Sequence, residues 1–147
     1  MTNTNIQRAR DIARDMIKKH EGFRKEVYKC PAGYLTVGYG RNLETVGVSE
    51  HEALIMLVSD MGTSVEYVRR KLMRCGLLFS EVSPNRIAAL IDFVFNVGAT
   101  TSDKFKKMWS CIDVGDWHGA SVELMNSKYA EQVGKRAVTL SNMLAEG

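Results

Sequence analysis

The sequence is poor in the residues that mark unusual protein classes. It has 2 prolines and 12 glycines in 147 residues, too few for a collagen-like or low-complexity disordered chain. Its three cysteines, Cys30, Cys75 and Cys111, cannot all pair and show no C-x-x-C spacing, which predicts free thiols and no metal site. Lys and Arg number 20 against 17 Asp and Glu, and this small excess indicates no nucleic-acid partner. What remains is an ordinary globular composition.

Long apolar segments are also missing. No run approaches the roughly 18 apolar residues that would span a bilayer, so we expect no stable membrane insertion. The first 22 residues are charged throughout and contain no apolar core typical of a signal peptide, which predicts that the chain does not export itself. With 45% hydrophobic residues, the length suits one domain, or at most two small lobes that share a core.

The first third of the chain combines a helix with short strands. Apolar residues recur at steps of three and four from Asn3 to His20, which predicts an amphipathic helix that ends near Gly22. Residues 23–48 are rich in Tyr and Val and are interrupted by Pro31 and several glycines, a pattern typical of an antiparallel hairpin or small sheet.

The rest of the chain is predicted to be helical. A capping box from Ser49 to Glu52 opens a long helix of roughly 24 residues. Ser83 and Pro84 open a second helix, apolar nearly all round and closed by Gly98, which we expect to be the central buried helix. Shorter helices are expected at 102–112, 116–126 and 134–145. The fold class is therefore α+β and mostly helical, one domain over 1–147: an N-terminal lobe (1–48), a connecting helix (49–75) and a helical lobe (76–147).

Three groups of residues could carry chemistry. Cys30 with His20, His51 or His118 could form a thiol–imidazole pair, although no nucleophile signature surrounds the cysteine and surface roles suit the histidines. The glycines of residues 33–40 match neither common phosphate-binding pattern and favour tight turns instead.

The third group is an acid at a helix end that faces a hairpin. Glu21 is followed nine residues later by Cys30 and six further on by Thr36. A carboxylic acid at the mouth of a cleft can protonate a glycosidic oxygen while a polar residue opposite holds the attacking water. On spacing alone, a glutamate at a helix end is more often a solvated charge.

The segment that holds this group, H-E-G-F-R…V-Y-K-C-P-A-G-Y-L-T-V-G-Y-G, resembles the catalytic segment of the phage T4-type lysozymes, glycoside hydrolase family 24. Residues 90–98, 117–132 and 135–136 resemble later family segments in the same order, so the resemblance covers nearly the whole chain. It implies that Glu21 is the general acid and that Thr36 holds the hydrolytic water. Cys30 stands where most members have Asp and a subset have Cys, and it could act as a base, position the water, or only pack.

The resemblance also implies a substrate site and a two-lobed lysozyme-like fold. Arg136 matches an arginine that faces the catalytic glutamate and would orient its carboxyl group. Arg41 departs from the family, which usually has His there, and this puts a local ion pair in question rather than the reaction. The positions that match saccharide contacts are Asn42, Phe95, Asn96 and Gln132, of which Phe95 could equally be a core residue.

The function implied is that of a phage endolysin, a monomeric muramidase that cleaves the β-1,4 bond between N-acetylmuramic acid and N-acetylglucosamine in peptidoglycan. Such an enzyme is made in the host cytoplasm and depends on a holin to reach the cell wall. No metal or organic cofactor is implied. The alternative is a non-catalytic protein that binds peptidoglycan on a degenerate lysozyme fold, which the changes at Cys30 and Arg41 would allow.

Overall fold

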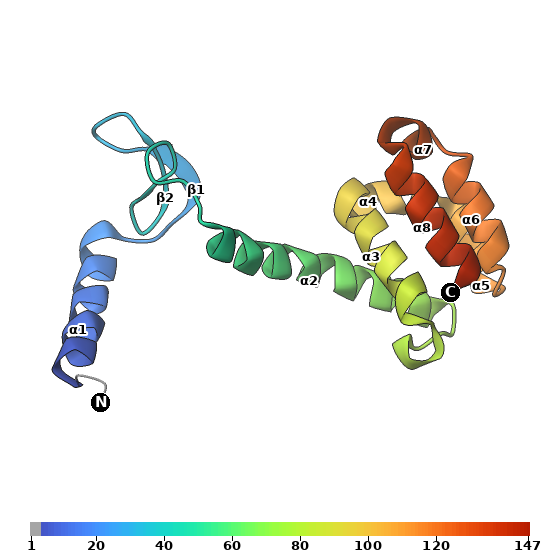
Figure 1. Ribbon diagram of the computed structural model, residues 1–147, viewed down its shortest axis with the longest axis horizontal. Helices are drawn as coiled ribbons and strands as arrows, with labels where there is room; N and C mark the ends of the chain where they lie inside the picture. Colours follow the sequence, from blue (N-terminus) through green and yellow to red (C-terminus); the bar gives the residue numbers. More distant parts are fainter. Residues whose placement is uncertain (1–3) are drawn as a thin grey trace. The chain divides into compact units, whose positions relative to one another are not determined.

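The computed structural model describes residues 4–147, and the chain divides into two compact units, Met1–Leu54 and Ile55–Gly147. We refer to them as the N-terminal unit and the C-terminal unit. The boundary falls within helix α2 (Glu50–Arg74), the long helix that the sequence predicts. The α+β class with a majority of helix is confirmed (Figure 1).

The N-terminal unit contains one helix and a small antiparallel sheet. Helix α1 (Thr4–Glu21) is followed by strands β1 (Arg24–Lys29), β2 (Leu35–Gly38) and β3 (Arg41–Asn42), paired in the order β1-β2-β3. Thr36 lies opposite both Tyr28 on β1 and Asn42 on β3, at the middle of the sheet. The expected hairpin is confirmed, and the predicted helix start at Asn3 lies outside the described residues.

Local chemistry explains where these elements begin and end. Gly22 adopts a φ of +68°, a conformation that L side chains rarely adopt, and so lets the chain leave α1 directly after Glu21. At the start of α2, the Glu52 N–H donates to Ser49 Oγ at 3.2 Å, and the Ser49 N–H donates to Glu52 Oε2 at 2.9 Å. The predicted capping box is therefore present.

The C-terminal unit is a helical bundle. A 3-10 turn, η1 (Phe79–Glu81), precedes α3 (Pro84–Val97), and α4 (Ala99–Ser102), α5 (Lys106–Asp113), α6 (Trp117–Met125), α7 (Lys128–Val133) and α8 (Lys135–Glu146) follow. Helix α8 packs between α3 and α6, and α5 packs on α6 (Figure 1). The core collects side chains from several helices; the large ones that are fully buried include Leu72, Leu90, Phe93, Met108, Ile112, Leu124 and Leu144.

Three expectations for this unit need correction. The helix expected at 102–112 begins only at Lys106, because the chain turns between α4 and α5, where the Phe105 ring packs edge-on against Phe93 with the ring centroids 4.8 Å apart. Helix α7 was not anticipated, although Ser127 caps it by accepting a hydrogen bond from the Ala130 N–H. Helix α3 is buried along one side and not all round, since Phe95 is 42% exposed.

Within residues 4–147, no helix is long and apolar enough to cross a membrane.

Candidate active site

Glu21 is the last residue of α1, and its carboxyl group is exposed. It lies against the turn that joins β2 to β3. A Cβ atom built on Gly40 would be 2.8 Å from Glu21 Oε2, so the carboxyl group sits almost directly on the glycine backbone. The sheet thereby brings the proposed acid beside the hairpin that carries the other two predicted catalytic residues.

Cys30 and Thr36 are neighbours at the β1–β2 turn. The Cys30 N–H donates to the Tyr34 carbonyl at 2.9 Å, and the Gly33 N–H donates to the Cys30 carbonyl at 2.8 Å, which closes a tight turn. The Thr36 hydroxyl donates to the same Tyr34 carbonyl at 3.0 Å, and Thr36 is only 3% exposed. The structure therefore brings these two predicted residues together.

The turn also acts on the thiol of Cys30. Its pKa is lowered from the ordinary cysteine value, chiefly by a hydrogen bond from the Tyr34 backbone N–H. The amides of Ala32 and Gly33 and the Thr36 hydroxyl act in the same direction, while desolvation opposes them. Because each of these groups stabilises the negative charge on sulfur, the turn favours the thiolate.

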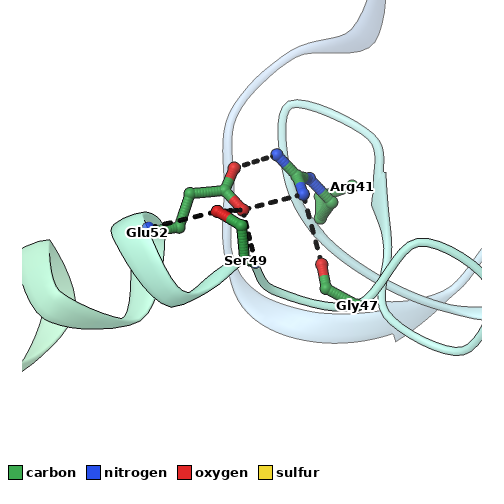
Figure 2. A network of polar contacts seen from close by, with 4 residues as sticks. All are labelled: Arg41, Gly47, Ser49 and Glu52. Carbon is green, nitrogen blue, oxygen red and sulfur yellow. Dashed lines mark hydrogen bonds and ion pairs between the residues drawn. The ribbon is translucent and has the colours of Figure 1, made fainter.

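Arg41 holds the strand β3 to the start of α2. Its guanidinium forms an ion pair with the Glu52 carboxylate and donates to the Gly47 carbonyl at 3.2 Å, as Figure 2 shows. The Ser49 backbone N–H and hydroxyl both donate to the same carboxylate at 2.9 Å. The Ser49 N–H, together with Arg41, lowers the pKa of Glu52 to about 2. Arg41, which departs from the family pattern described above, therefore has an ion-pair partner in Glu52.

Asn42, a predicted saccharide contact, is engaged in the following loop. Its Oδ1 accepts hydrogen bonds from the Glu44 N–H at 3.0 Å and the Thr45 N–H at 2.9 Å. These bonds fix the side chain on β3, next to Thr36 in the register of the sheet. A role for Asn42 in binding sugar stays a prediction.

The other predicted residues belong to the C-terminal unit. Arg136 on α8 donates from Nε to Asp92 Oδ1 on α3 at 2.7 Å. Phe95 and Asn96 are both exposed near the end of α3, so Phe95 is not a core residue, and Gln132 is exposed on α7. Phe95, Asp92 and Arg136 border a cavity of about 430 Å³, which is further lined by Leu57, Met61, Ala88 and Ile91.

Alternative chemistry finds little support in residues 4–147. No group of three or more His, Cys, Asp or Glu side chains there is placed to hold a metal ion. The three histidines, His20, His51 and His118, are exposed. The groups that act on the Cys30 thiol are backbone amides and a hydroxyl, which differs from the thiol–imidazole pair of a cysteine hydrolase.

Comparison with known proteins identifies the family to which the chain is similar. A sequence model of the family Phage lysozyme matches residues 18–143. The chain is 32% identical to an endolysin of Acyrthosiphon pisum secondary endosymbiont phage 1, over 82% of this chain and 80% of the relative. It is 27% identical to probable T4-type lysozyme 2 of Dictyostelium discoideum, over 91% of this chain and 94% of the relative.

Proposed function

Because the chain belongs to the phage lysozyme family, a membership that supports a glycoside hydrolase, we propose that it is a muramidase. Its substrate is peptidoglycan, and the bond cleaved is the β-1,4 link between N-acetylmuramic acid and N-acetylglucosamine. The observation that carries this proposal is the placement of three residues in the N-terminal unit. Cys30 and Thr36 are adjacent on the hairpin, and Glu21 lies against the next turn.

Glu21 supplies the proton in this reaction. Cleavage of a glycosidic bond requires protonation of the leaving oxygen, and an exposed carboxyl group at a helix end can reach a bound glycan strand. As the bond breaks, the proton passes from the Glu21 carboxyl group to that oxygen and leaves the side chain as a carboxylate. Water then supplies the hydroxyl group of the new reducing end.

Thr36 and Cys30 prepare that water. The Thr36 hydroxyl has one proton, which can be donated to the Tyr34 carbonyl or to the Cys30 sulfur. In either case its lone pairs can accept a hydrogen bond from water. Cys30 is the one of the three thiols whose pKa is lowered, whereas burial raises the pKa of Cys75 and Cys111. A thiolate at this turn can accept the proton that the attacking water loses, the role that a carboxylate has in most family members.

We assign saccharide contacts to Asn42, Phe95, Asn96 and Gln132. The exposed ring of Phe95 borders the cavity of the C-terminal unit, where an apolar sugar face or an N-acetyl methyl group would fit. We assign a supporting role to Arg136, whose guanidinium is held by Asp92.

In the cell, the protein acts as an endolysin and is a monomer without a cofactor. It is made in the host cytoplasm, reaches the wall through a holin, and lyses the host. Production in the cytoplasm of Gram-negative cells without a holin is therefore expected to leave the cells intact, and co-expression of a holin to lyse them. Lysis without a holin, followed as culture turbidity, would reveal a different route of export.

The decisive test is clearing of chloroform-treated Gram-negative cells by the wild type and by Glu21→Gln. Glutamine keeps the shape of the side chain but has no transferable proton, so the rate is expected to fall about 10²–10⁴-fold. Glu26→Gln, a change at an exposed glutamate on β1, is the matched control and should clear normally. Mass spectrometry of the released fragments should find muramic acid at the reducing end.

Each other outcome has a definite meaning. A Glu21→Gln variant that keeps more than a tenth of the wild-type rate contradicts the role of Glu21, provided that circular dichroism shows an intact fold. Wild-type protein that sediments with purified peptidoglycan but releases no fragments would instead establish the non-catalytic binding protein.

A further inference from the structure

We propose that Gly40 is a positioning residue for the reaction, because the absence of a side chain at this position leaves the space that the Glu21 carboxyl group occupies. The inference rests on the proposed function in taking Glu21 as the acid. It adds a residue that holds the acid in place without touching the substrate.

The atoms that a side chain at Gly40 would meet first all belong to Glu21. A Cβ atom at Gly40 would lie 2.8 Å from Oε2, 3.1 Å from Cδ and 3.5 Å from Cγ of Glu21, the three nearest atoms. Non-bonded carbon and oxygen atoms do not approach to 2.8 Å without a clash, since contacts between heavy atoms are optimal at about 3.5–4.0 Å. Any residue other than glycine would therefore push the carboxyl group away.

Other glycines of the same unit do not share this feature. Gly22, Gly33 and Gly38 also have positive φ angles, yet a Cβ built on them meets nothing within 4 Å. Gly47 would meet only a backbone oxygen, at 4.0 Å. Backbone conformation thus explains a glycine at each of these positions. At Gly40 there is a second reason for glycine, because the Glu21 carboxyl group occupies the space that a side chain would fill.

The nature of the neighbour decides what a substitution at Gly40 would do. The atoms that have to move belong to the end of a flexible, exposed side chain and not to the backbone or the core. The fold can therefore accept a Cβ at this contact, while the carboxyl group is displaced. A displacement of about 1 Å in a catalytic group can lower the rate about 10²-fold.

The experiment compares Gly40→Ala with Gly38→Ala. The two glycines have φ angles of +77° and +68°, so alanine strains the backbone similarly at both, but only alanine at 40 meets Glu21. With a soluble peptidoglycan fragment, we expect Gly40→Ala to lower kcat about 10–100-fold with little change in KM. Gly38→Ala should keep kcat near the wild-type value, and both variants should lose similar thermal stability.

A second pair of variants controls for the possibility that the alanine variants fold poorly. Asparagine tolerates positive φ better than alanine does, so Gly40→Asn and Gly38→Asn repeat the comparison with less strain. The proposal is overturned if kcat falls equally in the members of a pair, or if Gly40 variants keep the wild-type kcat. A crystal structure of Gly40→Ala, in which the Glu21 carboxyl group should have moved, tests the contact even if Glu21→Gln proves active and the proposed function fails.

Discussion

The two units of this protein are built by different forces. Of residues 4–54, Thr36 alone is buried, whereas every buried hydrophobic side chain of the described chain lies beyond residue 54. The N-terminal unit is shaped by turns, strand pairing and polar contacts, and the C-terminal unit by apolar packing. The groups proposed to carry out the chemistry all belong to the unit that has almost no core.

Polar contacts replace a core in the N-terminal unit. The Arg41–Glu52 pair joins β3 to α2, and the Leu35 N–H donates to Glu44 Oε2 at 2.8 Å. Exposed polar contacts of this kind stabilise a protein far less than a buried aromatic ring does. Regions with few buried apolar contacts open most easily, so we expect local unfolding to begin in this unit.

The largest effect on stability should therefore come from the C-terminal core. Phe93 is 1% exposed, and Phe93→Ala should lower the free energy of unfolding by about 3–5 kcal/mol, measured by urea denaturation. Val27→Ala on β1, where the side chain is 53% exposed, should change it by less than about 0.5 kcal/mol. Similar losses in the two variants would contradict the contrast between the units.

Substitution of Cys30 should show the reverse pattern, a loss of activity with little loss of stability. If the thiol activates or positions water, Cys30→Ala should lower the rate of peptidoglycan hydrolysis about 10²-fold or more, because Thr36 alone would hold the water. Cys30→Asp introduces a carboxylate, which can also accept a proton from water, and should keep substantial activity. An alanine variant that is folded and fully active would reduce Cys30 to a packing role.

Serine at position 30 separates the two active roles. It keeps hydrogen bonding but does not ionise near neutral pH, so activity in Cys30→Ser would indicate a positioning role. Loss in Cys30→Ser with activity in Cys30→Asp would indicate an ionised thiolate. Glu21 must keep its proton while Cys30 loses its own, so activity that depends on the thiolate should pass through a maximum with pH. Because the turn lowers the pKa of the thiol, the limb of the profile that the thiol sets should lie below the ordinary cysteine pKa. A pH–rate profile of the wild type checks this.

Local patterns in the sequence were sufficient for most elements. The capping box at Ser49, the proline at the start of α3 and the glycine after α1 act on their immediate neighbours, and each expected boundary is confirmed within a few residues. The break between α4 and α5 could not be predicted in this way, because it depends on packing of Phe105 against the α3 ring of Phe93.

The candidate site shows the same limit. Spacing and resemblance predict Glu21, Cys30 and Thr36 as candidate catalytic residues, and the pairing of the last two follows from a short hairpin. The partner of Arg136 is Asp92, 44 residues away, and no local pattern links the two. Glu52 was recognised as part of a capping box, yet its ion pair with Arg41 depends on how β3 meets α2.

A smaller effect on the stability of the N-terminal unit is expected at acidic pH. The pKa of Glu52 is about 2 in the folded protein against an ordinary 4.5, so its contribution to stability is complete above pH 4.5 and is lost as the pH falls toward 2. The protection of the Ser49 amide against hydrogen exchange should therefore fall across this range, and Glu52→Ala, which removes the acceptor, should lower that protection at every pH. Glu66→Ala is the control: Glu66 also has a pKa of about 2 but pairs only within α2, so its loss should leave the protection of the Ser49 amide unchanged.

The smallest effect, and one of opposite sign, is expected at Tyr129. Its ring is buried against Phe93 and Phe105, and among residues 4–147 its hydroxyl is the one buried side-chain polar atom without a hydrogen-bond partner. Because a buried hydroxyl without a partner destabilises the fold, Tyr129→Phe should keep the packing, remove this penalty and raise the melting temperature slightly. Calorimetry of the two proteins at the same pH measures the difference. A melting temperature that falls by several degrees would mean that the hydroxyl is hydrogen-bonded in solution, and that the C-terminal unit, like the N-terminal one, depends on a polar contact.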